Sequence, residues 1–318
     1  MRVDPVLGAA GAVAADTAGA SSIGIVRKLR LPVTSGVVKR VLLTGATGFV
    51  GRHVLRQLLA FGVPVTAVVR PGSSDRLGEL AGLVDLITTQ DLFQENAAWW
   101  QRACEGIDTI LHVAWYAAPG KYLQSPRNLD CLQGTLSLAR GAVAAGVRRF
   151  VGVGTCFEYD LTLGQPAGYL STDTPLRPAT TYAACKVAAF VTLAQWLATQ
   201  SVEFLWARLF YLYGEGENPQ RLVPYLHARL RAGEPAELTS GAQIRDFLDV
   251  SAAAEQLVAV TLSSRQGPLN ICSGEGITVR ALAERIADHY NGRELLRFGA
   301  RPDNRFDPPC VVGVRASA

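Results

Sequence analysis

Residues 41–54 have the sequence VLLTGATGFVGRHV, in which an apolar strand, a glycine turn and the start of a helix follow one another. Gly45, Gly48 and Gly51 let the chain turn sharply, bring backbone N–H groups close to a pyrophosphate and pack the helix on its strand. This order predicts a dinucleotide-binding turn, although glycines also serve plain turns. The expected cofactor contacts are Gly45, Thr47, Gly48, Phe49, Val50 and Gly51.

Around this stretch, β-branched runs alternate with amphipathic ones, a pattern typical of βαβ units. We therefore predict an α/β fold: a Rossmann-type doubly wound parallel sheet with a smaller C-terminal substrate-binding lobe. Residues 39–210 form the NAD(P)-binding domain, and 211–318 form mainly the substrate-binding lobe, with chain crossings between them. Expected strands are 40–44, 63–69, 83–88, 109–114, 149–154 and 203–209, and expected helices are 50–60, 128–145 and 182–199. In the lobe we expect helices 219–232, 251–262 and 279–290 and strands 236–238 and 269–272.

The composition is that of a folded protein, since 49% of the 318 residues are hydrophobic and 18% are charged. The formal net charge is +4 with no long basic run, which disfavours a nucleic-acid partner. No uncharged apolar stretch is long enough to span a membrane. Six dispersed cysteines favour reduced thiols and a cytoplasmic protein, and the histidines lack metal-ligand spacing. Residues 1–38 lack periodicity and predict a flexible leader; residues 6–15 only weakly resemble an export signal.

The end of the second expected strand indicates which cofactor is preferred. An acidic residue there would bind the ribose 2′-OH of NAD, but the chain has Arg70, followed by Ser73 and Ser74. A guanidinium suits a 2′-phosphate, so we expect NADP(H) to be preferred, with NAD(H) possible. The alternative is an ordinary solvated surface arginine.

Tyr182 and Lys186 stand four residues apart, on one face of an expected helix. An ammonium beside a phenol lowers the phenol's pKa, which would let Tyr182 exchange a proton near neutral pH. Thr155 follows the fifth expected strand, at the sheet edge where open α/β sheets bind ligands. Taken alone, Tyr182 and Lys186 fit an ordinary Tyr/Lys pair on an amphipathic helix better than a catalytic pair.

From about Lys39 to about Asp307 the chain resembles the extended short-chain dehydrogenases/reductases, in the branch that acts on nucleotide-diphosphate sugars. The resemblance rests on the glycine turn, on Thr155 with Tyr182 and Lys186, and on further motifs: Asp91-Leu92, residues 111–114, residues 208–214, Arg245-Asp246-Phe247 and residues 269–274. It implies that Tyr182 transfers a proton, Thr155 hydrogen-bonds the sugar oxygen and Lys186 holds the nicotinamide ribose. It also implies cofactor contacts at Asp91, Leu92 and Ala114, a nucleotide contact at Arg245 and a diphosphate contact at Arg301.

Several positions depart from the family pattern. Cys131 and Tyr211 each replace a usual Asn. The Asn replaced by Tyr211 commonly touches substrate phosphate in the family, so we expect Tyr211 to contact the substrate. Cys156-Phe157 replaces the Asp-Glu pair of sugar 4,6-dehydratases, which disfavours dehydration. Cys156 is either a second acid or an inert small hydrophobe, and Trp115 either a wall against the sugar ring or simple core. Glu158 is either a pocket carboxylate or a solvated loop charge.

We therefore expect NADPH-dependent reduction of a keto group, at C4, on a nucleotide-linked 4-keto-6-deoxysugar. The alternatives are a nucleotide-sugar epimerase, a reductase of a non-nucleotide carbonyl, or a non-catalytic nucleotide sensor that kept the fold. By the same resemblance we expect a homodimer through helices 128–145 and 182–199, unless their apolar residues are all core.

Overall fold

The computed structural model describes residues 38, 40–162, 169–304 and 307–315, which belong to one compact unit running from Val33 to Ala318. The predicted leader lies outside the described residues, except for Val38.

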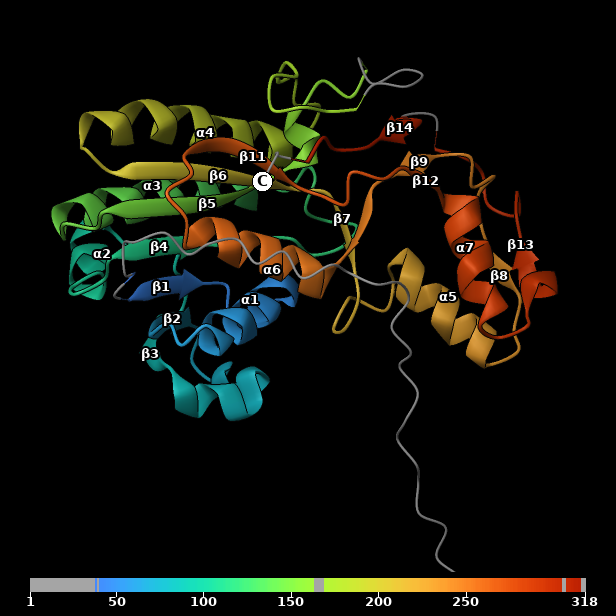
Figure 1. The fold of residues 1–318 in the computed structure, drawn as a ribbon, viewed down its shortest axis with the longest axis horizontal. Helices are drawn as coiled ribbons and strands as arrows, with labels where there is room; N and C mark the ends of the chain where they lie inside the picture. The colour runs from blue at the N-terminus through green and yellow to red at the C-terminus, as the bar shows by residue number, and fades with distance from the viewer. Residues whose placement is uncertain (1–37, 39, 163–168, 305–306, 316–318) are drawn as a thin grey trace, which may run out of the picture. The chain divides into compact units, whose positions relative to one another are not determined.

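A seven-stranded sheet forms the centre of the fold, in the order β11-β6-β5-β4-β1-β2-β3, and every neighbouring pair is parallel (Figure 1). The central strands are buried on both faces, which explains their continuous apolar sequences. The doubly wound parallel sheet is confirmed. Its strands are β1 (Val41–Thr44), β2 (Val65–Val69), β3 (Asp85–Thr88), β4 (Thr109–His112), β5 (Arg149–Thr155), β6 (Glu203–Leu209) and β11 (Gly267–Ile271).

Helices cover both faces of this sheet (Figure 1). On one face α1 (Phe49–Ala60) packs against α6 (Val250–Thr261), with Leu58 and Leu257 fully buried. On the other face α3 (Arg127–Ala144) packs between α2 (Ala97–Ala103) and α4 (Thr181–Thr199). Burying a leucine side chain contributes about 1.5–3 kcal/mol, so these two apolar clusters hold the helices on the sheet.

The chain crosses the expected boundary at residue 210. We expected helix 251–262 and strand 269–272 in the smaller lobe, and this placement is wrong. Strand β11 pairs with β6 in the large sheet, and α6 packs against α1. The apolar pattern identified both elements, but their partners are distant in sequence and left no local signal.

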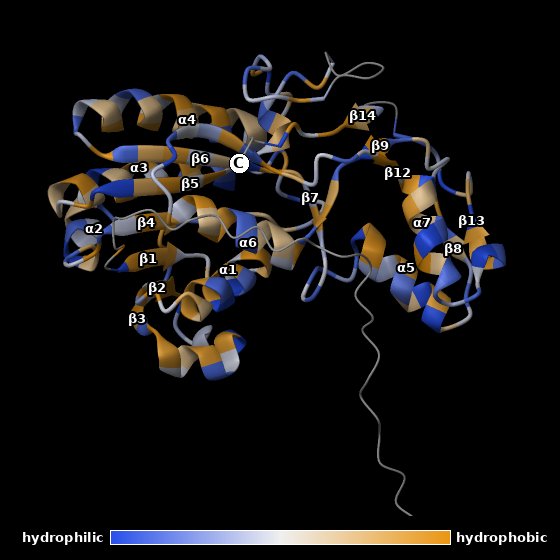
Figure 2. Cartoon of the chain, viewed as in Figure 1, coloured by the Kyte–Doolittle hydropathy of each residue, from blue (hydrophilic) through white to orange (hydrophobic). Residues whose placement is uncertain are grey.

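The smaller lobe has its own core, formed by α5 (Leu222–Arg231), α7 (Val279–Asp288), β8 (Ala236–Glu237) and β13 (Leu296–Arg297). In Figure 2, α7 alternates hydrophobic and hydrophilic residues, as expected of a helix with one buried face. The remaining strands are β7 (Tyr211–Tyr213) paired with β10 (Phe247–Asp249), and β9 (Ile244–Arg245) between β12 (Ile277–Thr278) and β14 (Cys310–Val311). The 3-10 helices are η1 (Ser74–Leu83), η2 (Cys156–Glu158) and η3 (Arg293–Leu295).

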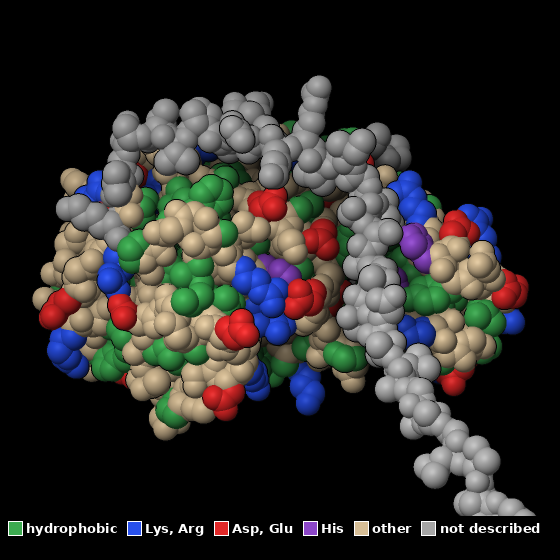
Figure 3. Space-filling model, turned by 60° about the horizontal axis from the view of Figure 1, so that its bottom comes forward, with side chains coloured by type: hydrophobic (Ala, Val, Ile, Leu, Met, Phe, Trp, Pro, Cys, Tyr) green, Lys and Arg blue, Asp and Glu red, His purple; other side chains and the backbone are tan. Residues whose placement is uncertain are grey.

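On the face shown in Figure 3, basic and acidic side chains are interspersed among apolar ones over the described residues. None of the helices in the described part of the chain is long and apolar enough to cross a membrane.

Candidate active site

The glycine turn between β1 and α1 has the geometry of a dinucleotide cradle. Gly45 has a φ of +78°, and a Cβ there would lie 2.8 Å from the Ala114 nitrogen at the end of β4. A Cβ on Gly51 would lie 2.0 Å from the Gly45 carbonyl oxygen, so only glycine lets α1 pack this closely on the turn. Gly48 caps α1 without a side-chain hydrogen bond, and the first turn carries no acidic residue. Backbone N–H groups at this helix start therefore suit a pyrophosphate.

A series of hydrogen-bonded, buried polar side chains fixes the end of β4, next to the glycine turn. The Thr44 hydroxyl accepts a hydrogen bond from the Ala114 nitrogen (3.2 Å) and lies 2.8 Å from His112 Nδ1. His112 Nε2 lies 2.9 Å from the Thr135 hydroxyl of α3. Burial lowers the pKa of His112 to about 3, helped by Lys186, so the imidazole is neutral. Ala114 thus stands beside Gly45, as expected of a cofactor contact.

Arg70 directly follows β2 and is exposed, and a turn stabilised by Ser73 comes after it, since the Ser73 hydroxyl donates to the Arg70 carbonyl (2.7 Å). Asp91 lies in the loop after β3, where one carboxylate oxygen accepts from Arg127 at 2.9 Å. Leu92 packs against the core beneath α2 and α3. All three residues follow strands that end at the same sheet edge as the glycine turn.

The structure brings Thr155, Tyr182 and Lys186 together. Thr155 is the last residue of β5, and Tyr182 and Lys186 lie in the first two turns of α4. The Thr155 side chain lies near enough to the Tyr182 phenol to lower its pKa. Lys186 Nζ is buried and donates to the Val153 carbonyl at 2.6 Å, so the ammonium is anchored to the same strand that carries Thr155.

Burial has the largest effect on the pKa values of Tyr182 and Lys186. It raises the pKa of Tyr182, with smaller rises from Tyr122, Glu158 and Cys156, while the Thr155 side chain lowers it. The expectation that Lys186 gives Tyr182 a low pKa is therefore wrong, because loss of water around the phenol is the largest effect and the neighbouring charges add to it. Burial also lowers the pKa of Lys186 to about 7, and Glu158 and Cys131 oppose that shift. Tyr182 is a neutral phenol near pH 7.

Trp115 is half-buried, and its ring centroid lies 3.8 Å from Lys186 Nζ. Its ring also meets Tyr182 edge-on, with centroids 6.4 Å apart. Trp115 therefore contacts both Lys186 and Tyr182, and we expect it to line the site.

Two further residues near Tyr182 escaped the sequence analysis. The Tyr122 ring packs edge-on against Tyr182 at a centroid distance of 4.8 Å, and burial raises the pKa of its hydroxyl, although Arg221 opposes that rise. Asn128 is fully buried: it accepts from Trp115 Nε1 (2.9 Å) and donates to the Tyr122 carbonyl (2.6 Å). Asn128 thus holds both rings that flank Tyr182. The only sequence signal was its place one helical turn before Cys131.

The two alternatives for Cys156 and Glu158 are now separated. Cys156 is buried, and burial raises the pKa of its thiol to about 12, as fits a small hydrophobe. Glu158 is fully buried and pairs with Arg208 at 2.7 Å. It is neither a solvated loop charge nor open to a pocket.

Among the residues expected to contact substrate, Tyr211 and Arg245 lie together. Arg245 is buried, with its guanidinium carbon 5.3 Å from the centre of the Tyr211 ring, and it pairs with Asp307 at 2.7 Å. Arg301 instead stacks on Tyr225 of α5 in the smaller lobe, 4.9 Å from the ring centre. The structure therefore does not bring Arg301 to Tyr211 and Arg245.

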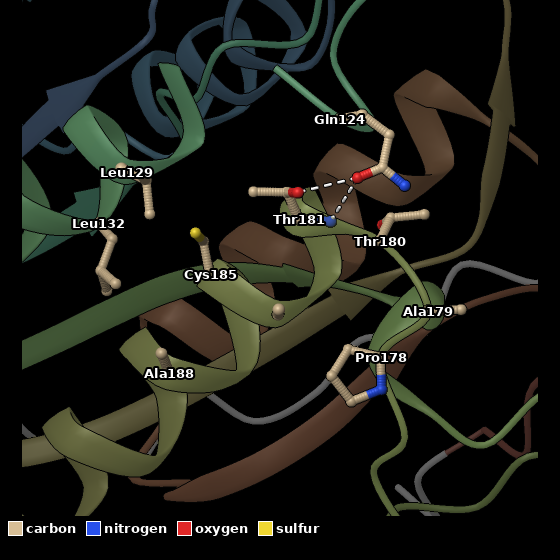
Figure 4. A pocket seen from close by; sticks show the side chains of 10 residues that line it. Gln124, Leu129, Leu132, Pro178, Ala179, Thr180, Thr181, Cys185 and Ala188 are labelled. Carbon is tan, nitrogen blue, oxygen red and sulfur yellow. Dashed lines mark hydrogen bonds between the residues drawn. The ribbon is translucent and has the colours of Figure 1, made fainter. Parts of the chain in front are cut away.

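A hollow of about 470 Å³ lies beside the start of α4 (Figure 4). Gln124 closes one end by accepting hydrogen bonds from the nitrogen and hydroxyl of Thr181. Cys185 lines this hollow whereas Tyr182 and Lys186 do not, so the hollow belongs to another face of α4. Its lining is Gln124, Leu129, Leu132, Pro178, Ala179, Thr180, Thr181, Ala184, Cys185 and Ala188.

Comparisons with known proteins agree with this geometry. The model of the NAD dependent epimerase/dehydratase family matches residues 41–272. The chain is 24% identical to the dTDP-6-deoxy-L-talose 4-dehydrogenase (NAD(+)) of Aggregatibacter actinomycetemcomitans, over 86% of this chain and 99% of that protein. It is 28% identical to the dTDP-4-dehydro-6-deoxy-D-allose reductase of Streptomyces bikiniensis, over 86% of each. A dTDP-glucose 4,6-dehydratase from Streptomyces venezuelae, solved with NAD bound, shares the fold at a TM-score of 0.73 and 24% identity, over 86% of this chain and 88% of that one.

Proposed function

Because the chain belongs to the NAD-dependent epimerase/dehydratase family, an extended short-chain dehydrogenase/reductase group, we propose that it reduces the C4 keto group of a nucleotide-linked 4-keto-6-deoxysugar with NADPH. The observation that carries this proposal is the neutral Tyr182 phenol, which lies near the Thr155 side chain at the carboxyl edge of the sheet. A relative named as a reductase of a dTDP-linked dehydro-deoxysugar supports the substrate class.

A bound nicotinamide supplies the hydride for such a reduction. Gly45, Gly48 and Gly51 would hold its pyrophosphate, and Lys186 its ribose. Thr155 and Tyr182 then orient the carbonyl oxygen, and the Tyr182 hydroxyl donates the proton that this oxygen takes up. A phenol that burial keeps protonated suits this direction of transfer, because reduction consumes a proton.

The surroundings of Thr155 favour reduction over dehydration. The next two residues, Cys156 and Phe157, offer no carboxylate, and the Cys156 thiol has a pKa of about 12. Eliminating water across the sugar needs a base and an acid in addition to the tyrosine. Reduction requires only the groups present at this site.

The test is to supply dTDP-, UDP-, GDP- and CDP-linked 4-keto-6-deoxyhexoses with NADPH and to follow both nicotinamide absorbance and sugar products. We expect stoichiometric NADPH oxidation and a deoxysugar alcohol. If the sugar product is epimerised and no NADPH is consumed, the enzyme is an epimerase and the proposal is wrong. If NADPH is oxidised only with carbonyl compounds that carry no nucleotide, the substrate is not a nucleotide sugar.

We expect Arg70 to set the cofactor preference. Exposed at the end of β2, its guanidinium is free to approach a 2′-phosphate. Arg70→Ala should lower kcat/KM for NADPH by about tenfold, since a charged hydrogen bond contributes about 1.5–3 kcal/mol, and leave kcat/KM for NADH nearly unchanged. Steady-state kinetics with both cofactors measures this. A wild-type enzyme that strongly prefers NADH would refute the preference.

We also expect a homodimer that buries the outer faces of α3 and α4. Leu129 of α3 and Val191 of α4 are 58% and 48% exposed, so the apolar residues of these helices are not all core. Leu129→Glu should shift the sedimentation coefficient from dimer to monomer. Leu83→Glu is the matched control, because Leu83 is 64% exposed at the end of η1, and it should leave the dimer intact. A monomeric wild-type protein would contradict the expectation.

A further inference from the structure

Glu158 forms a closed ion pair directly behind the candidate active site. Its side chain is fully buried, and Oε2 accepts from Arg208 Nε at 2.7 Å, while Arg208 is itself 1% exposed. Trp206 Nε1 also donates to the carboxylate, at 3.0 Å from Oε1. Withdrawing two charges from water costs several kcal/mol per ion, so a buried pair is weak evidence of a role in stability. The position of the pair beside the end of β5 is therefore the better guide to its role.

The carboxylate touches the strand end that carries Thr155. Glu158 Oε1 accepts from the Thr155 backbone nitrogen at 2.8 Å, and this bond closes the turn from β5 into η2. A Cβ on Gly154 would lie 2.4 Å from Oε1, so the carboxylate rests directly against the strand. The position of the Thr155 hydroxyl beside the Tyr182 phenol therefore depends on this contact.

The same charge also acts on Lys186. The Trp206 ring, which donates to Glu158, lies 5.7 Å from Lys186 Nζ. The titratable groups around this ammonium are Glu158 of η2, Cys131 of α3, His112 of β4 and Tyr182 of its own helix. His112 is neutral, and burial raises the pKa of Cys131 to about 11. The Glu158 carboxylate, which pairs with Arg208, makes the largest contribution to raising the pKa of Lys186.

We propose that Glu158 is a positioning residue for Thr155, Tyr182 and Lys186: it fixes Thr155 through the backbone and acts on the Lys186 ammonium with its buried negative charge. This inference rests on the proposed reduction for its kinetic consequence, but not for its effect on Lys186. Glu158 raises the pKa of Lys186 against the lowering by burial, so removing its charge lets Lys186 lose its proton at lower pH. If activity needs the protonated Lys186, the alkaline limb of the pH profile then moves to lower pH.

The test compares Glu158→Gln with a matched variant at the other end of the same strands. Gln keeps the size and one acceptor oxygen but removes the charge. Glu203→Gln is the control: Glu203 pairs with Arg149 at 2.7 Å, at the amino ends of β5 and β6. We expect Glu158→Gln to lower kcat by about tenfold or more with a small change in KM, and to move the alkaline limb of the pH profile to lower pH. Glu203→Gln should keep both.

A second variant separates positioning from folding. Glu158→Gln leaves Arg208 buried and unpaired, which destabilises the protein. In Glu158→Gln/Arg208→Met the apolar Met occupies the space between the Tyr159 and Phe190 rings, each 4.7 Å from the guanidinium carbon. This double variant should recover Tm but not kcat or the pH profile. Recovery of all three would reduce Glu158 to a structural role and overturn the inference.

A direct titration of Lys186 makes the inference independent of the substrate. Isotope-labelled lysine can be followed by NMR with little overlap, because the other lysines are Lys28, Lys39 and Lys121. The Lys186 signal should titrate near pH 7 in the wild type and at lower pH in both Glu158→Gln variants. An unchanged Lys186 titration refutes the inference even if the enzyme is a reductase. A changed titration in an enzyme that reduces no keto sugar supports it while refuting the proposed function.

Discussion

Tyr182→Phe should lower kcat by about 10²–10⁴-fold, because it removes the hydroxyl that delivers the proton. Phe keeps the ring that packs against Tyr122 and Trp115, so the cofactor and substrate sites keep their shape. We therefore expect KM and cofactor affinity to change little. Nicotinamide absorbance measures the rate, and fluorescence of bound NADPH measures the affinity.

Tyr290→Phe is the matched control. Its hydroxyl lies 2.9 Å from His227 Nδ1 and links α5 to the residues that follow α7, so the substitution also deletes one partly buried phenol hydrogen bond. It lies in the smaller lobe's own core, and we expect wild-type kcat with a slightly lower Tm. Wild-type turnover by Tyr182→Phe would show that another group protonates the sugar oxygen.

The parts of the site that the sequence predicted are those encoded locally. Gly45, Gly48 and Gly51 lie within seven residues of one another, and Tyr182 and Lys186 within one turn of helix, so local spacing together with the family resemblance identified them. Neither pattern depends on which strands become neighbours. The succession of strands β1 to β6 along the chain followed from the alternation of strands and helices for the same reason.

What the sequence did not predict depends on packing between distant segments. Strand β11 joins β6 across about 60 residues, and Asn128 reaches Trp115 and Tyr122 only once α3 is seated. Burial also reverses the expected pKa of Tyr182, and burial is a property of the folded core rather than of a motif. The role of Glu158 also depends on distant packing, since Glu158 lies in η2 and its partner Arg208 lies on β6.

Gly51→Ala should abolish tight cofactor binding. The added Cβ would lie 2.0 Å from the Gly45 carbonyl oxygen and 3.0 Å from Ala46 Cα, both backbone atoms that cannot rotate away. Helix α1 must then shift off the turn, which moves the N–H groups that suit the pyrophosphate. Overpacking of this kind costs about 1–3 kcal/mol of stability, so Tm should fall as well. Cofactor affinity should fall by at least about tenfold, as measured by NADPH fluorescence or calorimetry.

Gly82→Ala separates this effect from glycine loss in general. A Cβ on Gly82 would meet no atom within 4 Å, and we expect wild-type affinity and Tm. If Gly51→Ala bound NADPH as tightly as this control, the cofactor would not lie on the turn between β1 and α1. Tyr182 would then have no hydride donor beside it, so the proposed reduction depends on this glycine as much as on the phenol.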